Sequence, residues 1–203
     1  MTDTMLGKTT RTHLGADAAS LARRLAQFAA ITKPDSGPGV TRLAYTPLER
    51  QAHAVFADYM AGQGLQVWTD AAGNTIAHRP GTDETLPAIG TGSHLDSVIQ
   101  AGSYDGIAGV VASMEIAELL QRHEIPHRHP FRFVVFAAEE GARFGQACTG
   151  SRIAGGLTSA ADLDSLVDSD GVSIAEAMRA VDIDPTMVEQ ARWRTEDWRA
   201  FIE

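Results

Sequence analysis

Two adjacent carboxylates, Glu139 and Glu140, follow an apolar run from Phe131 to Phe136. Two acids beside a buried strand are unfavourable unless positive charge compensates them. A histidine and further acids occur upstream, in His94-Leu95-Asp96 and in Tyr104-Asp105-Gly106. Imidazole and carboxylate groups are ligands for divalent cations, which would supply the compensating charge. The set therefore indicates a hydrolase site that holds two metal ions.

The spacing of these residues suggests how they divide the chemistry. His94 and Asp96 are two residues apart and face the same side of an extended backbone, so Asp96 can support His94 as a ligand, directly or through the local backbone. Asp105 has two carboxylate oxygens and can bridge two cations. The adjacent glutamates point in different directions in an extended chain, so one can bind metal while the other handles a proton. These ligands suit Zn²⁺, with Mn²⁺ or Co²⁺ as alternatives.

Each motif also has a plainer interpretation. An H-x-D pair is commonly a surface polar pair, a Glu-Glu pair is commonly solvated, and Asp-Gly is commonly a turn. Their joint occurrence in this order favours the metal site. The histidines of the segment 123–129 are expected to be solvated loop residues, with a metal site as the alternative. Cys148 is expected to be a small buried residue rather than a reactive thiol.

The elements that must position these residues alternate along the chain. Asp17 predicts the start of a helix over 17–32, and Thr46-Pro47 with Glu49 predicts a capped helix to about residue 61. The other predicted elements are strands over 65–69, 75–78, 87–91 and 131–136, a helix over 106–122, and helical segments near 160–167, 173–180 and 185–192. This order predicts an α/β fold with a mostly parallel, partly mixed sheet flanked by helices. Sites in such sheets form at the carboxyl ends of strands, where His94 and Glu139 would lie.

Composition narrows the classes of protein that fit. The chain has 203 residues, 44% of them hydrophobic and 21% charged, which is typical of a globular protein. Its net charge of −9 argues against binding to nucleic acid or to an anionic membrane surface. The stretch from Met1 to Thr12 is polar and does not resemble a signal peptide, and no apolar run is long enough to cross a bilayer. With a single cysteine, these features predict a cytoplasmic protein.

The motifs together resemble a known family, the hydantoinase/carbamoylase amidohydrolases. This group contains N-carbamoyl-L-amino-acid hydrolases, β-ureidopropionases and allantoate amidohydrolases, within the dinuclear zinc aminoacylases and aminopeptidases. The resemblance covers about residues 40–160 and is carried by TRLAYT (41–46), DAAGN (70–74), GTGSHLDSV (90–98), YDGIAGV (104–110), EEGARFG (139–145) and TGSR (149–152). It implies a zinc-aminopeptidase-like catalytic domain.

The resemblance also implies a role for each site residue. His94 would bind the first metal ion, Asp105 would bridge both, and Glu140 would bind the second. Glu139 would be the general base, and Asp96 would support His94. The implied reaction is hydrolysis of the C–N bond of a small ureido or carbamoyl substrate, with release of ammonia and carbon dioxide.

Arg143, three residues after Glu140, is expected either to contact that substrate or to pair with a site carboxylate.

The chain also departs from the family pattern. Family members are about twice as long, supply two further histidine ligands, and contain a small lid domain through which they form homodimers. We therefore expect residues 1–203 to be the N-terminal part of a catalytic domain, with an exposed apolar sheet edge near residues 200–203. The alternatives are an aminopeptidase or aminoacylase on the same scaffold, and a non-catalytic remnant that serves as a folding or partner-binding unit.

Overall fold

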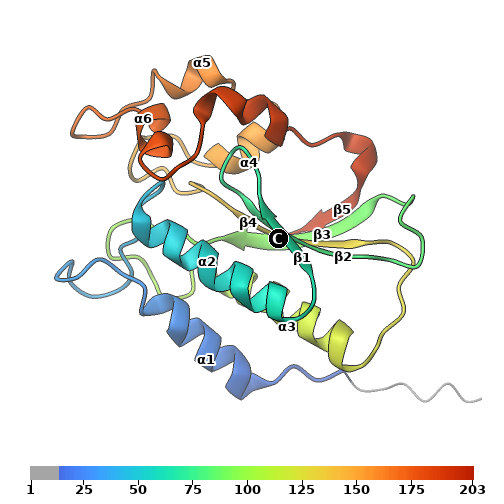
Figure 1. Ribbon diagram of the computed structural model, residues 1–203. Helices are drawn as coiled ribbons and strands as arrows, with labels where there is room; N and C mark the ends of the chain where they lie inside the picture. The colour runs from blue at the N-terminus through green and yellow to red at the C-terminus, as the bar shows by residue number, and fades with distance from the viewer. Residues whose placement is uncertain (1–13) are drawn as a thin grey trace, which may run out of the picture.

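A five-stranded sheet with helices on both sides forms the centre of the computed structural model, which describes residues 14–203 (Figure 1). The helices are α1 (Ala18–Ala29), α2 (Pro47–Gly62), α3 (Ile107–Arg122), α4 (Thr149–Ala154), α5 (Ala160–Leu163) and α6 (Ile174–Arg179), with 3₁₀ helices η1 (Pro185–Ala191) and η2 (Thr195–Asp197). The strands are β1 (Gln66–Thr69), β2 (Thr75–Arg79), β3 (Ala88–His94), β4 (Phe131–Phe136) and β5 (Trp198–Ile202). The polar stretch from Met1 to Thr12, considered above for a signal peptide, lies outside the described residues.

The sheet has the strand order β1-β2-β4-β3-β5. Strand β3 pairs in parallel with β4 and β5, whereas β1–β2 and β2–β4 are antiparallel. The predicted α/β fold with a mixed sheet and flanking helices is confirmed, and two of these four pairings are parallel. Helix α3 makes the crossover that a parallel β3–β4 pair requires.

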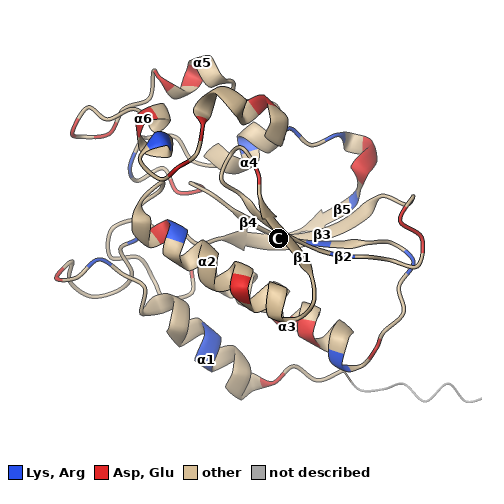
Figure 2. Cartoon of the chain, viewed as in Figure 1, with Lys and Arg blue, Asp and Glu red and all other residues tan. Residues whose placement is uncertain are grey.

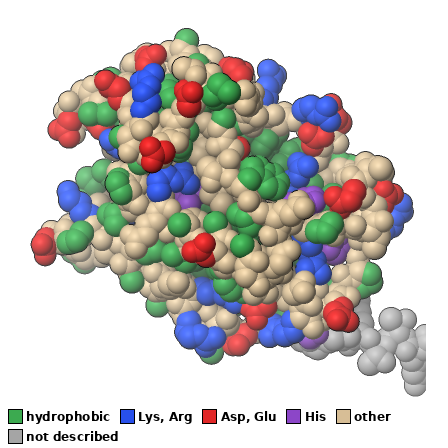
Figure 3. All heavy atoms as spheres, in the orientation of Figure 1, with side chains coloured by type: hydrophobic (Ala, Val, Ile, Leu, Met, Phe, Trp, Pro, Cys, Tyr) green, Lys and Arg blue, Asp and Glu red, His purple; other side chains and the backbone are tan. Residues whose placement is uncertain are grey.

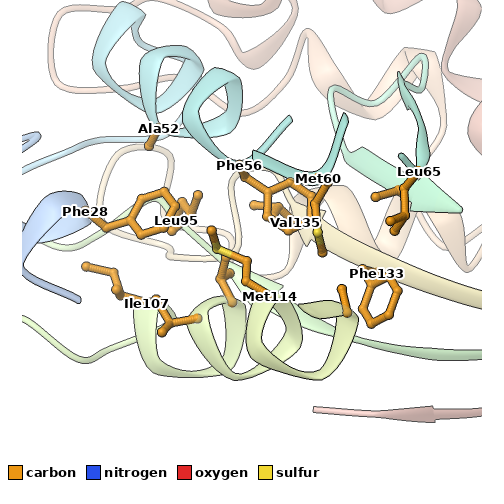
Figure 4. Close-up of a cluster of buried hydrophobic side chains, with 14 of the residues drawn as sticks. Phe28, Ala52, Phe56, Met60, Leu65, Leu95, Ile107, Met114, Phe133 and Val135 are labelled. Carbon is orange, nitrogen blue, oxygen red and sulfur yellow. The ribbon is translucent and has the colours of Figure 1, made fainter. Parts of the chain in front are cut away.

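Alternation along β4 divides the hydrophobic core. Phe133 and Val135 face α2 and α3, where they contact a cluster that includes Phe56 and Met114 (Figure 4). The intervening residues Val134 and Phe136 belong to a separate cluster with Ile76, packed against Trp193, Trp198 and Phe201. Successive side chains of a strand point to opposite faces, so β4 is apolar on both sides. A third cluster, around α4, α5 and α6, lies beyond the carboxyl end of β4.

The start signals of the first two helices are confirmed. The side chain of Asp17 accepts hydrogen bonds from the N–H groups of Ala19 and Ser20, and Thr46 accepts one from the N–H of Glu49. Glu49 itself does not close a capping box on Thr46. Its carboxylate accepts instead from the N–H of Tyr45 at 2.6 Å, because the side chain turns inward towards the sheet.

Three elements differ from the expectation. Strand β3 continues beyond residue 91 to His94, α4 has no counterpart among the predicted elements, and β5 begins at Trp198, slightly before the sheet edge that was expected near residues 200–203. Helix α4 has only six residues, and it begins after Cys148, which has a left-handed backbone with φ of 62°. So short a helix carries too few apolar positions for a 3.6-residue period to be recognised.

Charged residues lie mainly on helices and connecting loops (Figure 2). On the face shown in Figure 3, acidic and basic side chains are interspersed over the described residues rather than gathered into a basic patch. Within residues 14–203, no helix is both long and apolar enough to cross a membrane.

Candidate metal centre

The parallel pairing of β3 with β4 brings the predicted ligands together. His94, the last residue of β3, is in register with Phe136, the last residue of β4, so the segments after both strands leave the same edge of the sheet. Asp105 lies just before α3, on the crossover between these strands. One donor atom from each of His94, Asp105 and Glu140 lies within 4.8 Å of the others. The structure therefore brings these three predicted ligands into one cluster.

The imidazole of His94 is oriented by the backbone of Asp96. Its Nδ1–H donates to the carbonyl oxygen of Asp96 at 3.0 Å, which orients the ring and turns Nε2 towards the carboxylates. Nε2 lies 3.9 Å from Oδ1 of Asp105. Metal binding requires Nε2 to give up its proton, and an imidazole held in this way then directs its Nε2 lone pair at the carboxylate oxygens, as in a metal ligand.

The carboxylate of Asp96 also binds the backbone after β4, a contact that the sequence did not predict. Its Oδ1 accepts the N–H of Glu139 at 3.0 Å and its Oδ2 accepts the N–H of Glu140 at 2.8 Å. Oδ1 also lies 3.5 Å from Nδ1 of His94. Asp96 therefore connects the end of β3 with the end of β4, and supports His94 through both its backbone and its charge.

The proximity of several acidic groups shifts the pKa values of Glu140 and His94. Burial raises the pKa of Glu140, His94 opposes the rise, and the charges of Asp105 and Asp96 add to it. Burial alone would lower the pKa of His94, but the hydrogen bonds and charge of Asp96, with the charge of Glu140, raise it to about 9.

Glu139 points away from Glu140. Its Oε1 accepts the N–H of Ser151 at 2.9 Å and its Oε2 accepts the Ser151 hydroxyl at 2.8 Å. Burial raises the pKa of Glu139, and these two hydrogen bonds oppose the rise. A partly buried carboxylate beside the ligand cluster is positioned to accept a proton from a water molecule in the site.

The donor set fits a divalent cation. One imidazole nitrogen and two carboxylate oxygens converge, and these are ligand types that Zn²⁺, Mn²⁺ and Co²⁺ accept. A divalent cation would also offset the repulsion between the acids. The carboxylate of Asp105 has two oxygens, the number that bridging two ions requires.

Arg143 does not pair with a carboxylate of this cluster. Its Nε donates to Oδ2 of Asp168 at 3.0 Å, and its Nη1 donates to the carbonyl oxygens of Ala44 and Tyr45. These contacts join the loop after Glu140 to the start of α2. A substrate contact by Arg143 stays a prediction.

The loop histidines are held by local contacts. His127 accepts from Nε of Arg79 at 3.1 Å and donates to the carbonyl of His129, and His129 donates to the carbonyl of Pro87. With both ring nitrogens of His127 engaged, the metal-binding alternative for this loop finds no support.

The expectation of a buried thiol at Cys148 is wrong. This residue is exposed. Its backbone N–H bonds to the carbonyl of Glu139 at 2.7 Å, which fixes a left-handed turn that directs the side chain outward.

Sequence reasoning missed several residues that shape the site. Ser151 holds Glu139, and the buried guanidinium of Arg42 donates to the carbonyl of Leu95, between His94 and Asp96. Both lie in the motifs TGSR and TRLAYT, so these motifs were the available signal.

A mixed sheet with a His-Asp-Glu cluster at its carboxyl edge is an arrangement suited to metal-assisted hydrolysis. The chain belongs to peptidase family M28, whose family model matches residues 74–199.

Two curated relatives and one solved structure refine the comparison. The chain is 45% identical to the N-carbamoyl-L-amino-acid amidohydrolase of Paenarthrobacter aurescens over 181 residues, which cover 89% of this chain and 43% of the relative. It is 30% identical to the allantoate amidohydrolase of Escherichia coli K12 over 169 residues, which cover 83% of this chain and 41% of the relative. A hydantoinase/carbamoylase family amidase from Burkholderia ambifaria superposes with a TM-score of 0.79 at 34% identity, covering 86% of this chain and 42% of that one.

These matches confirm the resemblance to the hydantoinase/carbamoylase amidases. The chain spans less than half the length of the relatives that it matches.

Proposed function

We propose that the protein is a metal-dependent amidase that hydrolyses the C–N bond of N-carbamoyl or ureido compounds. The convergence of His94, Asp105 and Glu140 within 4.8 Å carries this proposal. The substrate class comes from the relatives, which are named for N-carbamoyl-L-amino acids and for allantoate.

The residues of the chain have distinct roles in this proposal. His94, Asp105 and Glu140 would hold the divalent ions. When bound, these ions would acidify water and stabilise negative charge on the carbamoyl oxygen. Glu139 accepts the proton of the attacking water and returns it to the leaving nitrogen. Ser151 holds Glu139 in place for both transfers.

The overall reaction balances as addition of water across a carbamoyl group. An N-carbamoyl amino acid and one water yield the free amino acid, carbon dioxide and ammonia. That residues 1–203 form the N-terminal part of a larger, homodimeric catalytic assembly in the cytoplasm stays a prediction.

An ammonia-release assay tests the activity. The protein as its gene encodes it, loaded with Zn²⁺ or Mn²⁺, is supplied with N-carbamoyl amino acids and with allantoate. We expect turnover in the wild type and a loss of at least about a hundredfold in Glu139→Gln, which removes the base. Cleavage of peptide or acyl bonds without ammonia would instead indicate the aminopeptidase or aminoacylase alternative.

Metal titration of the 203-residue chain tests the non-catalytic alternative. The non-catalytic alternative predicts that this polypeptide binds no metal ion tightly. Isothermal titration with Zn²⁺ measures this. Tight sites in the wild type that are lost in His94→Ala would contradict the non-catalytic alternative.

A further inference from the structure

Residues 137–140, which carry the proposed base and a proposed ligand, lie beyond the end of the sheet. Strand β4 ends at Phe136, and β3 ends beside it at His94. Backbone N–H groups that are buried beyond the sheet need other acceptors, or each costs about 1 to 3 kcal/mol.

Side chains supply all four acceptors. Oδ1 of Asn74 accepts the N–H of Ala137 at 2.9 Å, and Oε1 of Glu49 accepts the N–H of Ala138 at 2.9 Å. The two oxygens of Asp96 accept the N–H groups of the glutamates that follow. Asn74, Glu49 and Asp96 are each 1% exposed or less.

The carbonyl side of the segment is also bonded. The carbonyl oxygens of Ala137, Ala138 and Glu139 accept the N–H groups of residues 150, 149 and 148. The segment is therefore held on both edges, on one by backbone and on the other by side chains from distant parts of the chain.

Ala138 is the point at which this segment turns. Its φ is 57°, a left-handed conformation that costs a residue with a Cβ roughly 1 to 2 kcal/mol. Directly after this turn, the carboxylates of Glu139 and Glu140 diverge, one to Ser151 and the other to the ligand cluster. An acceptor placed at the N–H of Ala138 stabilises the turn that separates them.

We propose that Glu49 is a positioning residue of the candidate metal centre, whose buried carboxylate holds Ala138 in the turn that directs Glu139 and Glu140. Its Oε2 binds the N–H of Tyr45 at the start of α2, so the carboxylate ties this helix to the metal-binding segment. The expected effect of Glu49 on metal binding rests on the proposed function, whereas its effect on the backbone at Ala138 does not.

The competing explanation is that Glu49 only stabilises the start of α2. A capping role needs the contact with Tyr45 but does not need the contact with Ala138, which lies 89 positions further along the chain. Thr46→Ala removes the cap of α2 and leaves the Ala138 contact in place, so it separates the two explanations.

Cobalt binding by the protein as its gene encodes it provides the first measurement. Titration with Co²⁺, followed by visible absorbance, gives the metal affinity without depending on activity. We expect Glu49→Gln to weaken Co²⁺ binding about 10- to 100-fold. The side-chain NH₂ of glutamine cannot accept a hydrogen bond, so either the N–H of Tyr45 or that of Ala138 loses its acceptor. Thr46→Ala, and Glu115→Gln as a control that alters a buried carboxylate between α1 and α3, should leave the affinity unchanged.

Amide hydrogen exchange of the metal-free protein provides the second measurement. The amides of residues 138–140 should be protected in the wild type, and Glu49→Gln should accelerate their exchange while that of Val135 in β4 stays slow. Wild-type amides at 138–140 that exchange as fast as those of the exposed turn at 102–103 would overturn the proposal, and this comparison needs no variant to fold. Equal Co²⁺ affinities of Glu49→Gln and Glu115→Gln would also overturn it. A wild type that binds no Co²⁺ contradicts the metal proposal, while the exchange result still tests the role of Glu49.

Discussion

The imidazole of His94 is packed against a backbone position that only glycine can occupy comfortably. Gly106 has φ of +63°, and a Cβ built on it would lie 2.5 Å from the carbonyl oxygen of His94 and 2.6 Å from its Nδ1. The turn before α3 therefore packs directly against the imidazole ring and the carbonyl group of His94, with no room for a side chain at residue 106. This explains why a glycine directly follows the proposed bridging ligand Asp105.

Gly106→Ala should displace the His94 ring. We expect metal affinity to fall at least about tenfold and the free energy of unfolding to fall by about 1 to 3 kcal/mol, because a left-handed alanine is strained and its methyl group meets the ring. Co²⁺ titration and urea unfolding measure both effects. Gly102→Ala, where a Cβ meets nothing within 4 Å, is the matched control. Equal behaviour of the two variants would show that the ring has room to move.

Glu49 should also make stability depend on pH. Burial, with the charge of Asp96, raises its pKa to about 7, against the opposing effects of Arg50 and the backbone hydrogen bonds. The unfolded chain ionises Glu49 near its ordinary pKa of 4.5, so the folded state holds more protons between these values. Its contribution to stability is therefore greatest below pH 4.5 and is lost as pH rises towards 7.

Urea unfolding across about pH 4 to 8 measures this contribution in metal-free buffer. The stability of the wild type relative to Glu49→Gln should fall by about 3 kcal/mol between pH 4.5 and 7 and then level off. Subtracting the variant removes the contributions of all other groups. A difference that is constant with pH would show that Glu49 ionises normally in the folded protein.

That His94, Asp105 and Glu140 offer possible ligand atoms was evident from residue type, and that they lie together agrees with the predicted cluster. The acceptor roles of Glu49 and Asn74 were not evident. Both residues act on backbone N–H groups more than sixty positions away, and no local pattern encodes such a contact.

Among the elements, α1 is attached to the rest of the fold by a buried ionic network. Nη1 of Arg24 in α1 donates to Glu115 of α3 at 2.8 Å, and its Nη2 contacts Glu118 of α3 and Tyr59 of α2. Three helices thus meet at the guanidinium of Arg24, a buried residue.

Removal of this guanidinium should loosen α1. We expect Arg24→Ala to lower the free energy of unfolding by about 3 kcal/mol, because it removes the nearest cation from the buried carboxylate of Glu115. The exposed neighbour Arg23 provides the control, and Arg23→Ala should cost no more than about 0.5 kcal/mol. Urea unfolding of both variants measures the two losses in the free energy of unfolding. Equal losses would mean that apolar contacts alone attach α1.

Long elements were predicted correctly from their patterns. Helix α3 and strand β4 each carry enough periodic apolar residues to identify them, and Thr46-Pro47 marks the start of α2. Helix α4 was missed, and the sheet edge at β5 was placed two residues too late, because both elements are short. Their conformations depend on what they pair with, namely the segment after β4 and the edge of β3.

At the scale of the described fold, β5 is one of the two edge strands of the sheet. Within the described residues β5 pairs only with β3, and Ile202 is 63% exposed. An edge strand with an exposed apolar side chain is a template for pairing with another chain. This agrees with the expectation of an apolar sheet edge near residues 200–203.

The 203-residue polypeptide should therefore self-associate through β5. Light scattering over a concentration series should reveal species larger than a monomer, and Ile202→Lys should reduce them, because a charge on an edge strand opposes pairing. Leu157, which is 67% exposed outside the sheet, provides a control, and Leu157→Lys should leave association unchanged. A monomer at all concentrations would contradict this expectation.

Local chemistry was sufficient to predict the class of site and the α/β architecture. Residue types state which atoms can hold a cation, and apolar periodicity states which segments form strands and helices. Tertiary structure alone established how the segment 137–140 is held. Its four N–H groups find acceptors on three side chains from separate parts of the chain, because the sheet has ended and buried donors must still be paired.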